Sequence, residues 1–311
     1  MTPDASAITK GRRRFEGPPR IALEPSGSRG WLVDAIEAGS GEVVPLADAE
    51  AIVWATPTGP EQLRDTVASA PLVHWVQLPW AGVEPFIDVL DKDHLWTCGK
   101  GVYAEPVAEH ILMLALAGMR GLATYARADE WGRPQGRNLL GANVVILGGG
   151  GITDSLLRLL GPFNCTTTVV RRSASPTLDD LDALLPDADL VVVALALTPE
   201  TIGVIDFRRL ALMKPTAWIV NLARGRHIVT DDLVDALRAG TIGGAALDVT
   251  EPEPLPAGHP LWTLDNCLIT PHVGNTPEMA VPLLTARVTE NVRRFGDGEP
   301  LIGIVDVEAG Y

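Results

Sequence analysis

Hydrophobic residues fall into short runs that alternate with amphipathic stretches along most of the chain. Short runs of β-branched and aliphatic residues indicate buried strands, whereas apolar positions three or four residues apart indicate helices. In the first part of the chain we expect strands in RIALEP, AIVWATP and LVHWVQLP, and helices in SRGWLVDAIEAG and EQLRDTVASA. Strands that alternate with helices predict βαβ units and a parallel sheet.

A longer helical stretch, Pro106 to about Ala126, precedes a second and more regular alternation. Six segments there indicate strands: ANVVILG, TTTVV, ADLVVVAL, AWIVNL, GGAALDV and NCLITPH. A final helix, about Pro277 to Phe295, leads into a short tail and could return to the first unit. The pattern therefore predicts two α/β units, the first of them discontinuous.

Composition narrows the class of protein. The chain has 311 residues, 46% of them hydrophobic and 21% charged, which is typical of a globular protein with room for two domains. A net charge of -14 argues against nucleic-acid or anionic-membrane partners. No stretch is apolar enough over sufficient length to span a membrane, and the basic start of the chain lacks the apolar core of a secretory signal. We expect a cytoplasmic protein with a mobile tail over residues 1–19.

Three cysteines, Cys98, Cys165 and Cys267, are widely separated, and no CxxC or other metal-ligand spacing is present. We therefore expect reduced thiols and no bound metal.

The run Gly148-Gly149-Gly150-Gly151 follows a strand pattern and opens a helix. This is the context in which a GxGxxG-like fingerprint indicates dinucleotide binding. Gly148 allows a tight turn, Gly150 lets the backbone approach a pyrophosphate, and the N–H groups at the helix start, from Ile152 onward, bind that anion.

The fingerprint is imperfect. Thr153 stands where a third glycine is expected, and its hydroxyl could cap the helix or reach a phosphate. Asp154 suits the helix dipole but repels a nearby pyrophosphate. A glycine turn without a ligand is the alternative interpretation.

The next strand ends in Arg171-Arg172. A carboxylate at this point binds the ribose hydroxyls of NAD, whereas an arginine can pair with the 2′-phosphate of NADP. We therefore favour NADP(H) over NAD(H), although two surface arginines would give the same pattern.

Three further stretches begin at predicted strand ends: NLARGRHIV, LDVTEPEPLPAGHPLW and LITPHVGNT. In an open α/β sheet the carboxyl ends of the strands line the ligand crevice. Arg224, Glu253 and His272 could therefore converge on one site. Each alone could equally be an ordinary surface or structural residue.

With these stretches the chain resembles the D-isomer-specific 2-hydroxyacid dehydrogenase family over most of residues 75–311. The resemblance includes AGV at Ala81–Val83, PVAEH at Pro106–His110 and LTPET at Leu197–Thr201. It implies a Rossmann-type doubly wound parallel sheet inserted into a flavodoxin-like α/β domain, and usually a homodimer. We assign residues 20–102 and 283–311 to the substrate-binding domain, and residues 103–282 to the dinucleotide-binding domain.

The resemblance also implies site residues. Arg224, Glu253 and His272 match the catalytic set, and Asp248 matches the aspartate near the nicotinamide carboxamide. The substrate loop, here Trp80, Ala81 and Gly82, presents backbone N–H groups to the substrate carboxylate. We expect the cofactor site to include Gly148, Gly149, Gly150, Gly151, Ile152, Arg171, Arg172, Leu195, Ala196, Leu222, Ala223 and Asp248.

The chemistry of these residues suits reduction of a 2-oxoacid. Hydride delivery to a carbonyl carbon leaves charge on its oxygen, which His272 can neutralise as a proton donor. Glu253 beside it favours the imidazolium, and Arg224 offers a forked donor to the substrate carboxylate. Trp80 either fills the pocket or packs outward, and we interpret His110, His227 and His259 as structural.

We therefore predict an NADPH-preferring 2-oxoacid reductase, with glyoxylate and hydroxypyruvate as the first substrates to test. Within the resembling family, Glu253 argues against formate as substrate, because formate enzymes pair the histidine with a glutamine. The three candidate catalytic residues do not exclude phosphite as the substrate. A non-catalytic dinucleotide-sensing scaffold of the corepressor type is the alternative from another functional class.

Overall fold

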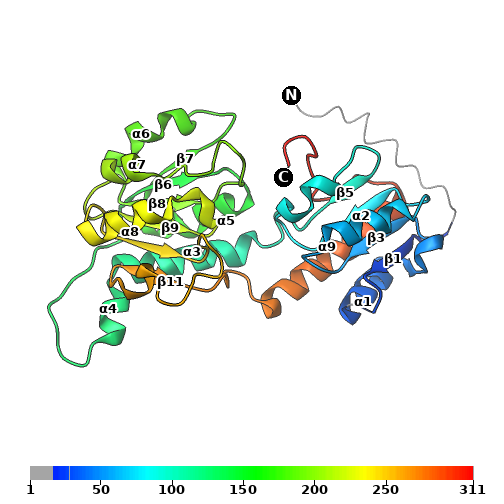
Figure 1. The fold of residues 1–311 in the computed structure, drawn as a ribbon, viewed down its shortest axis with the longest axis horizontal. Helices are drawn as coiled ribbons and strands as arrows, with labels where there is room; N and C mark the ends of the chain where they lie inside the picture. The colour runs from blue at the N-terminus through cyan, green and yellow to red at the C-terminus, as the bar shows by residue number, and fades with distance from the viewer. Residues whose placement is uncertain (1–16, 28, 311) are drawn as a thin grey trace. The chain divides into compact units, whose positions relative to one another are not determined.

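The computed structural model describes residues 17–27 and 29–310. The predicted N-terminal tail lies outside the described residues as far as residue 16. The described chain divides into two compact units, drawn in Figure 1. The first unit combines the residues up to Tyr103 with those from Pro277 onward, and the second unit is Ala104–Thr276. The return to the first unit thus begins at Pro277 and not at residue 283, because one continuous helix starts there.

The first unit holds a five-stranded sheet in the order β2-β1-β3-β4-β5, with every neighbouring pair parallel. Its strands are β1 (Arg20–Glu24), β2 (Glu42–Val43), β3 (Ala51–Trp54), β4 (Trp75–Gln77) and β5 (Leu95–Thr97). This is the flavodoxin-like strand order. The three predicted strands are present as β1, β3 and β4. The sequence missed β2, which is two exposed residues, and β5, whose apolar pair lies in the polar stretch DKDHLWTCGK.

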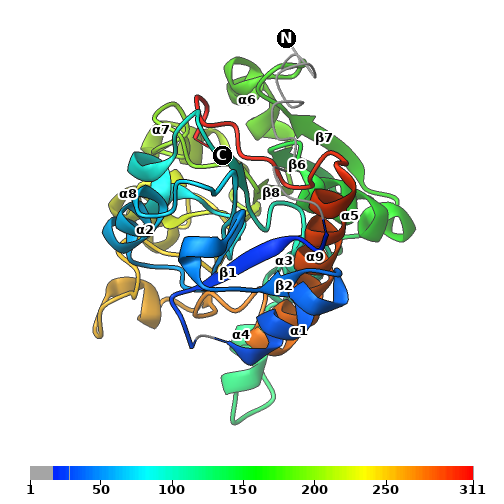
Figure 2. The same cartoon turned by 90° about the vertical axis from the view of Figure 1, so that its right-hand side faces the viewer.

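Helices cover both faces of this sheet. α1 (Gly30–Ala38) and α9 (Pro277–Asp297) pack side by side on one face, as Figure 2 shows. α2 (Pro60–Ala68) and the short helix η3 (Glu84–Val89) contribute to the core on the other face. The buried side chains of α9 recur three or four residues apart, which is the spacing that keeps them on one helical stripe.

The second unit holds a six-stranded parallel sheet in the order β11-β10-β9-β8-β6-β7. The strands are β6 (Asn143–Leu147), β7 (Thr166–Val170), β8 (Leu190–Val193), β9 (Trp218–Asn221), β10 (Gly244–Leu247) and β11 (Cys267–Ile269). They coincide with the six predicted segments. Central strands such as β8 are buried along their whole length, because a parallel sheet is covered on both faces. The predicted class, two parallel-sheet α/β domains of Rossmann type, is confirmed.

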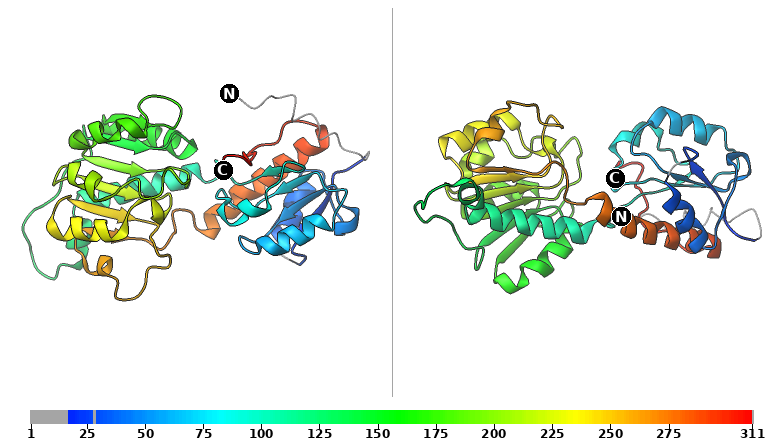
Figure 3. Two further views of the ribbon diagram at one scale, coloured as in Figure 1. Left: turned by 45° about the horizontal axis from the view of Figure 1, so that its top comes forward. Right: turned by 90° about the horizontal axis from the view of Figure 1, so that it is seen from below.

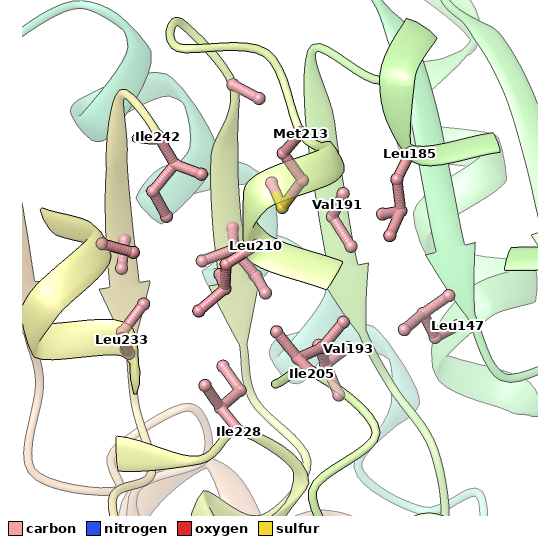
Figure 4. Packing of buried hydrophobic residues seen from close by; sticks show 14 of the residues in the cluster. Leu147, Leu185, Val191, Val193, Ile205, Leu210, Met213, Ile228, Leu233 and Ile242 are labelled. Carbon is pink, nitrogen blue, oxygen red and sulfur yellow. The ribbon is translucent and has the colours of Figure 1, made fainter. Parts of the chain in front are cut away.

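Two separate cores flank this sheet. α3 (Ala104–Met119) and α5 (Gly151–Leu160) cover one face, and α6 (Leu181–Leu184), α7 (Phe207–Leu212) and α8 (Thr230–Ala239) the other. Figure 3 shows the two layers of helices, and Figure 4 shows the aliphatic packing beneath α7 and α8. Short 3-10 helices lie at Leu46–Asp48, Gly161–Phe163, Leu178–Asp180, Leu185–Asp187, Gly225–His227 and Pro260–Thr263.

The long helix predicted from Pro106 to Ala126 is two helices. α3 ends at Met119, and α4 (Leu122–Arg127) follows after a break. Gly121 adopts φ 66°, in the left-handed region that interrupts a helix. Within the described residues, no helix has both the length and the apolar character needed to cross a membrane.

Close packing of α3 on the sheet depends on a missing side chain. A Cβ at Gly118 would lie 2.3 Å from the indole of Trp218 on β9. Alanine normally stabilises a helix by up to about 1 kcal/mol relative to glycine. At Gly118, steric overlap with Trp218 should instead make alanine destabilising.

We predict that Gly118→Ala lowers the free energy of unfolding by about 1–3 kcal/mol. Chemical denaturation measures this change. Gly161→Ala, where an added Cβ meets nothing within 4 Å, serves as the control and should be nearly neutral. Equal stability of the Gly118 variant and the unchanged protein would contradict the packing argument.

Candidate active site

The carboxyl ends of the six strands of the second unit carry nearly all the residues that the sequence singled out. Gly148–Gly151 follow β6, Arg171 and Arg172 follow β7, and Leu195 and Ala196 follow β8. Arg224 follows β9, Asp248 and Glu253 follow β10, and His272 follows β11. Because the strands are parallel, these loops lie at one edge of the sheet. Most candidate cofactor residues thus follow β6, β7 and β8, and the rest, Leu222, Ala223 and Asp248, follow β9 and β10. The candidate catalytic residues follow β9, β10 and β11.

The glycine run makes the turn from β6 into α5. Gly148 has φ 113°, and a Cβ there would lie 2.2 Å from the carbonyl oxygen of Ala194. Only glycine combines that backbone conformation with that approach. The turn therefore requires glycine at this position.

The next residues leave bare backbone at the start of α5. Gly150 precedes the helix in an extended conformation, and a Cβ there would meet nothing within 4 Å. Gly149, Gly150 and Gly151 are exposed. The first N–H groups of an α-helix have no partner within the helix and attract anions. This segment therefore fits the diphosphate of a nicotinamide dinucleotide.

Thr153 neither caps the helix nor is available to a phosphate, contrary to the two roles considered from sequence. The residue is fully buried, and its hydroxyl donates to the carbonyl oxygen of Gly148 at 2.7 Å. The threonine thus ties the first turn of α5 back to the glycine turn. Asp154 is exposed, so water solvates its charge.

The two arginines after β7 have different surroundings. The Arg171 side chain crosses the glycine turn, because a Cβ at Gly149 would lie 2.8 Å from Arg171 Nε. Arg172 is exposed, and its charge contributes to lowering the pKa of Glu200, after the hydrogen bonds that this carboxylate receives. Arg171 is therefore the one held beside the dinucleotide-type turn.

The loops after β8 and β9 are joined by a buried histidine. His227 lies within 3.2 Å of the carbonyl oxygen of Leu195 through Nε2 and within 3.0 Å of that of Thr201 through Nδ1. Leu222 and Ala223 are buried, whereas Ala196 is exposed. His227 thus has structural contacts that fix the spacing of these two loops.

Arg224 is half-buried at the end of β9. Asn221 accepts from the N–H of Ala223 and donates to the carbonyl of Arg224, which fixes the loop. A Cβ at Gly225 would lie 2.0 Å from the Thr250 carbonyl, so the loop is pressed against the one after β10. The guanidinium itself donates to the carbonyl of Ala223 at 2.7 Å.

His272 and Glu253 are paired, although they are nineteen positions apart. His272 Nδ1 lies 2.6 Å from Glu253 Oε1, and both side chains are about half exposed. The pair leaves Nε2 of the imidazole for another partner. His272 has φ 53°, an uncommon backbone conformation for a residue other than glycine, which the surrounding loop must hold in place.

The loop that carries His272 is fixed by a buried carboxylate. Asp248 accepts hydrogen bonds from the Thr270 hydroxyl at 2.5 Å and from the N–H groups of Val273 and Gly274, each at 2.9 Å. Its backbone carbonyl accepts from the N–H of His272 at 2.8 Å. Asp248 therefore holds the residues on both sides of His272.

His110 completes this cluster from α3. Its Nε2 lies 3.1 Å from the Thr270 hydroxyl and 3.5 Å from Asp248 Oδ1. The sequence interpretation of His110 as structural and of Asp248 as a cofactor neighbour gave no indication of this contact. The only signal was the PVAEH motif, which does not reveal a partner 138 positions later.

Burial alone raises the pKa of the Asp248 carboxyl. The hydrogen bonds from His110 and Thr270 and from the N–H groups of Val273 and Gly274 outweigh burial and lower that pKa to about 2. The ionised form is therefore the one that the folded loop requires.

The candidate substrate loop belongs to the first unit and follows β4. Trp80 is half-buried and packs against Tyr103, with ring centroids 6.0 Å apart. The N–H of Gly99 donates to the carbonyl of Trp80 at 2.8 Å, and the Tyr103 hydroxyl donates to that of Pro79 at 3.3 Å. Ala81 and Gly82 follow directly in this braced loop.

Two parallel-sheet α/β units, one with a glycine turn that leads into a helix, form an architecture that nicotinamide-dependent oxidoreductases use. Comparisons with known proteins specify the class. The D-isomer specific 2-hydroxyacid dehydrogenase NAD binding domain matches residues 110–274. The chain belongs to the D-isomer specific 2-hydroxyacid dehydrogenase family and is an NAD(P)-dependent oxidoreductase.

Individual relatives agree with this assignment. The chain is 41% identical over 255 residues to an uncharacterized protein in the proB 3′ region of Corynebacterium melassecola, covering 77% of this chain and 84% of the relative. It is 34% identical over 218 residues to glyoxylate reductase from Pyrococcus furiosus, covering 64% of this chain and 65% of that enzyme. A D-isomer specific 2-hydroxyacid dehydrogenase from Xanthobacter autotrophicus Py2, solved with NADPH and MES, superimposes with a TM-score of 0.81 at 27% identity, over 95% of this chain and 100% of the other.

Asp248→Asn should loosen the loop that carries His272. An amide cannot accept the same set of hydrogen bonds, and loss of a charge-assisted bond costs about 2 kcal/mol. We expect a lower free energy of unfolding and lower activity, measured by denaturation and steady-state kinetics. The folded-state pKa of Asp248 is below its ordinary 3.8, so its contribution is present above about pH 4 and is lost as the pH falls towards 2. The Asn variant should lack the contribution to stability that unchanged Asp248 loses in acid. If the two proteins gave the same curve of stability against pH, the anchoring role of Asp248 would be contradicted.

Proposed function

We propose that the protein reduces small 2-oxoacids to D-2-hydroxyacids, with NADPH as the preferred cofactor. The observation that carries the proposal is the His272–Glu253 pair at 2.6 Å, at the same sheet edge as the glycine turn. A histidine oriented by a carboxylate is the arrangement of a general acid. The proposed substrate class agrees with the name of the glyoxylate reductase relative.

Each residue has a distinct role in the proposed reaction. A reduced nicotinamide, when bound, supplies hydride to the carbonyl carbon. His272 donates a proton from Nε2 to the carbonyl oxygen, because Nδ1 is held by Glu253. Arg224 binds the substrate carboxylate through its forked guanidinium. Asp248 acts as a positioning residue through the backbone of His272.

Arg171 supports the preference for NADPH. Its side chain crosses Gly149 beside the start of α5. Among the described residues, Arg171 forms no ion pair. A guanidinium there can bind a ribose 2′-phosphate. The Xanthobacter enzyme was solved with NADPH, which agrees with this assignment. Gly148–Ile152, Leu195, Ala196, Leu222 and Ala223 would line the rest of the cofactor site.

His272→Gln should lower kcat for glyoxylate by about 10²–10⁴-fold, because the proton donor is lost. Glu253→Gln should lower kcat less, because the proton donor itself is kept. A matched control exists in the first unit, where His94 Nδ1 lies 2.9 Å from Asp91. His94→Gln should leave turnover unchanged, whereas full activity of the His272 variant would refute the role.

Arg171→Asp should shift the cofactor preference from NADPH towards NADH. Loss of a charge-assisted contact with the phosphate predicts a change of roughly 10- to 100-fold in the ratio of kcat/KM for the two cofactors. Steady-state assays with both cofactors measure this ratio. The control is Arg64→Asp on the exposed face of α2, and an unchanged ratio in the Arg171 variant would reject the phosphate role.

Other parts of the proposal concern assembly. We expect a cytoplasmic homodimer. The surface that favours contact with a second copy is α4 and the loop after it, which extend from the second unit in Figure 1. Leu122, Trp131 and Leu140 are 54%, 101% and 61% exposed there. These exposed apolar side chains are the reason for choosing this surface as the candidate contact.

The alternative function, a non-catalytic dinucleotide-sensing scaffold, was supported by the altered glycine fingerprint at Thr153 and Asp154. Thr153 is turned into the fold and Asp154 is solvated, so neither residue blocks the anion site. Phosphite remains a compound to include in the substrate panel, since the three catalytic candidates do not distinguish it.

A further inference from the structure

The candidate substrate loop is held by the segment that follows β5, residues 98–103, which belongs to the same unit. Three consecutive carbonyl groups of the loop accept hydrogen bonds from this segment. They are those of Pro79 (from the Tyr103 hydroxyl, 3.3 Å), Trp80 (from the Gly99 N–H, 2.8 Å) and Ala81 (from the Cys98 thiol, 3.6 Å). The segment therefore fixes the orientation of three successive peptide groups.

These contacts also decide where the N–H groups of the loop point. In a trans peptide the N–H is directed opposite to the C=O, and the peptide bonds of this loop are trans. Because the carbonyls of residues 79–81 face the segment, the N–H groups of Trp80, Ala81 and Gly82 point away from it. Those N–H groups donate to no group among the described residues. Consecutive N–H groups of this kind can bind an anion such as a carboxylate.

Arg287 on α9 fixes the segment in turn. Its Nη1 donates to the carbonyl of Cys98 at 3.3 Å and to that of Lys100 at 3.0 Å. The side chain is half-buried, and burial lowers the pKa of the guanidinium because part of its charge is removed from water. Hydrogen bonds from a charged donor are stronger than those between neutral groups. Arg287 is therefore a firm anchor for the start of the segment.

The chain near its C-terminus keeps this guanidinium in place. The N–H of Cys98 donates to the carbonyl of Gly303 at 2.8 Å. A Cβ at Gly303 would lie 2.4 Å from the Cys98 carbonyl oxygen and 2.7 Å from Arg287 Nη1. The three groups pack this closely only because residue 303 has no side chain. The Arg287 side chain thus has little freedom to leave the carbonyls that it binds.

We propose that Arg287 is a positioning residue for substrate binding. Through the carbonyls of Cys98 and Lys100 it holds the segment that orients the N–H groups of residues 80–82 towards a substrate carboxylate. Arg287 itself bonds to backbone and not to the substrate. The inference deepens the proposed function and rests on it, because the 2-oxoacid supplies the carboxylate.

Arg287→Met keeps an unbranched side chain but removes every donor. We expect the KM for glyoxylate to rise roughly 10-fold, because misdirected N–H groups bind the carboxylate less well. The kcat and the KM for NADPH should change less than about 2-fold, since the proton donor is untouched. Arg287→Lys retains a charged donor and should recover most of the affinity. Steady-state kinetics measure these changes.

Oxamate provides a readout that does not depend on turnover. It carries a carboxylate next to a carbonyl group but is not reduced. Its dissociation constant in the presence of NADPH, measured by isothermal titration calorimetry, should rise in Arg287→Met by about the same factor as the KM. In hydrogen-exchange experiments the bonded amides of Cys98, Gly99 and Val102 should exchange faster in this variant, whereas strands β6 to β9 should keep their protection.

Two further variants complete the test. Tyr103→Phe removes the donor to Pro79 without changing Arg287, and should raise the KM for glyoxylate roughly 3-fold. Arg293→Met is the matched control on the same helix, because Arg293 pairs with carboxylates and not with the segment. It should leave the KM unchanged. Thermal denaturation verifies that each variant is folded, and Tyr103→Phe decides the outcome if Arg287→Met is not.

The outcomes separate the inference from the proposed function. An unchanged KM in Arg287→Met and in Tyr103→Phe would overturn the inference and leave the proposed function standing. A lower kcat with an unchanged KM and faster exchange throughout the protein would indicate a general structural role, and would overturn the inference as well. If the unchanged protein turned over no oxoacid with either cofactor, the proposed function would fail. Weaker oxamate binding in Arg287→Met would then still support the positioning role, and unchanged oxamate binding would overturn it.

Discussion

The candidate active site depends on one buried carboxylate. Asp248 is 4% exposed, yet it stays ionised because four donors surround it. Those donors come from α3 and from the loop after β11, so the charge joins elements that are far apart in the sequence. His272 is thereby held in a left-handed backbone conformation from which its imidazole reaches Glu253. A loop without this anchor would lose the orientation that a proton donor needs.

The parallel sheet supplies the second constraint. Because every strand of the second unit runs in the same direction, the six following loops meet at one edge. Close backbone contacts then set their spacing. Gly148 is pressed against Ala194, and Gly225 against Thr250, so neighbouring loops are fixed relative to one another by the absence of side chains. Glycine therefore serves two purposes here, an open surface for an anion at Gly150 and tight packing elsewhere.

Much of this architecture could be predicted from the pattern of residues. All six strands of the second unit were recognised from the sequence, including β11, which has only three residues. In the first unit β2 was missed because it is two exposed residues, and β5 because its apolar pair lies in the polar stretch DKDHLWTCGK. The pairing of His272 with Glu253 was expected from motif positions, whereas the contact of His110 with Asp248 was not, since no local pattern encodes contacts over such a distance. Thr153 looked like a defect in the fingerprint because its buried bond to Gly148 depends on the turn geometry.

The distribution of charge bears on the proposed cofactor site. Several surface arginines are neutralised locally: Arg208 and Arg209 share Asp182, and Arg293 and Arg294 share Glu290. Exposed pairs of this kind contribute little stability, but they leave no net field. Arg171 has no such ion pair among the described residues, and it stands at the end of β7 beside the glycine turn. In a protein with excess negative charge, anionic ligands are repelled by the average surface and attracted only where a cation is uncompensated. Arg171 lies beside the glycine turn, which is where the proposed function needs such a cation for a phosphate.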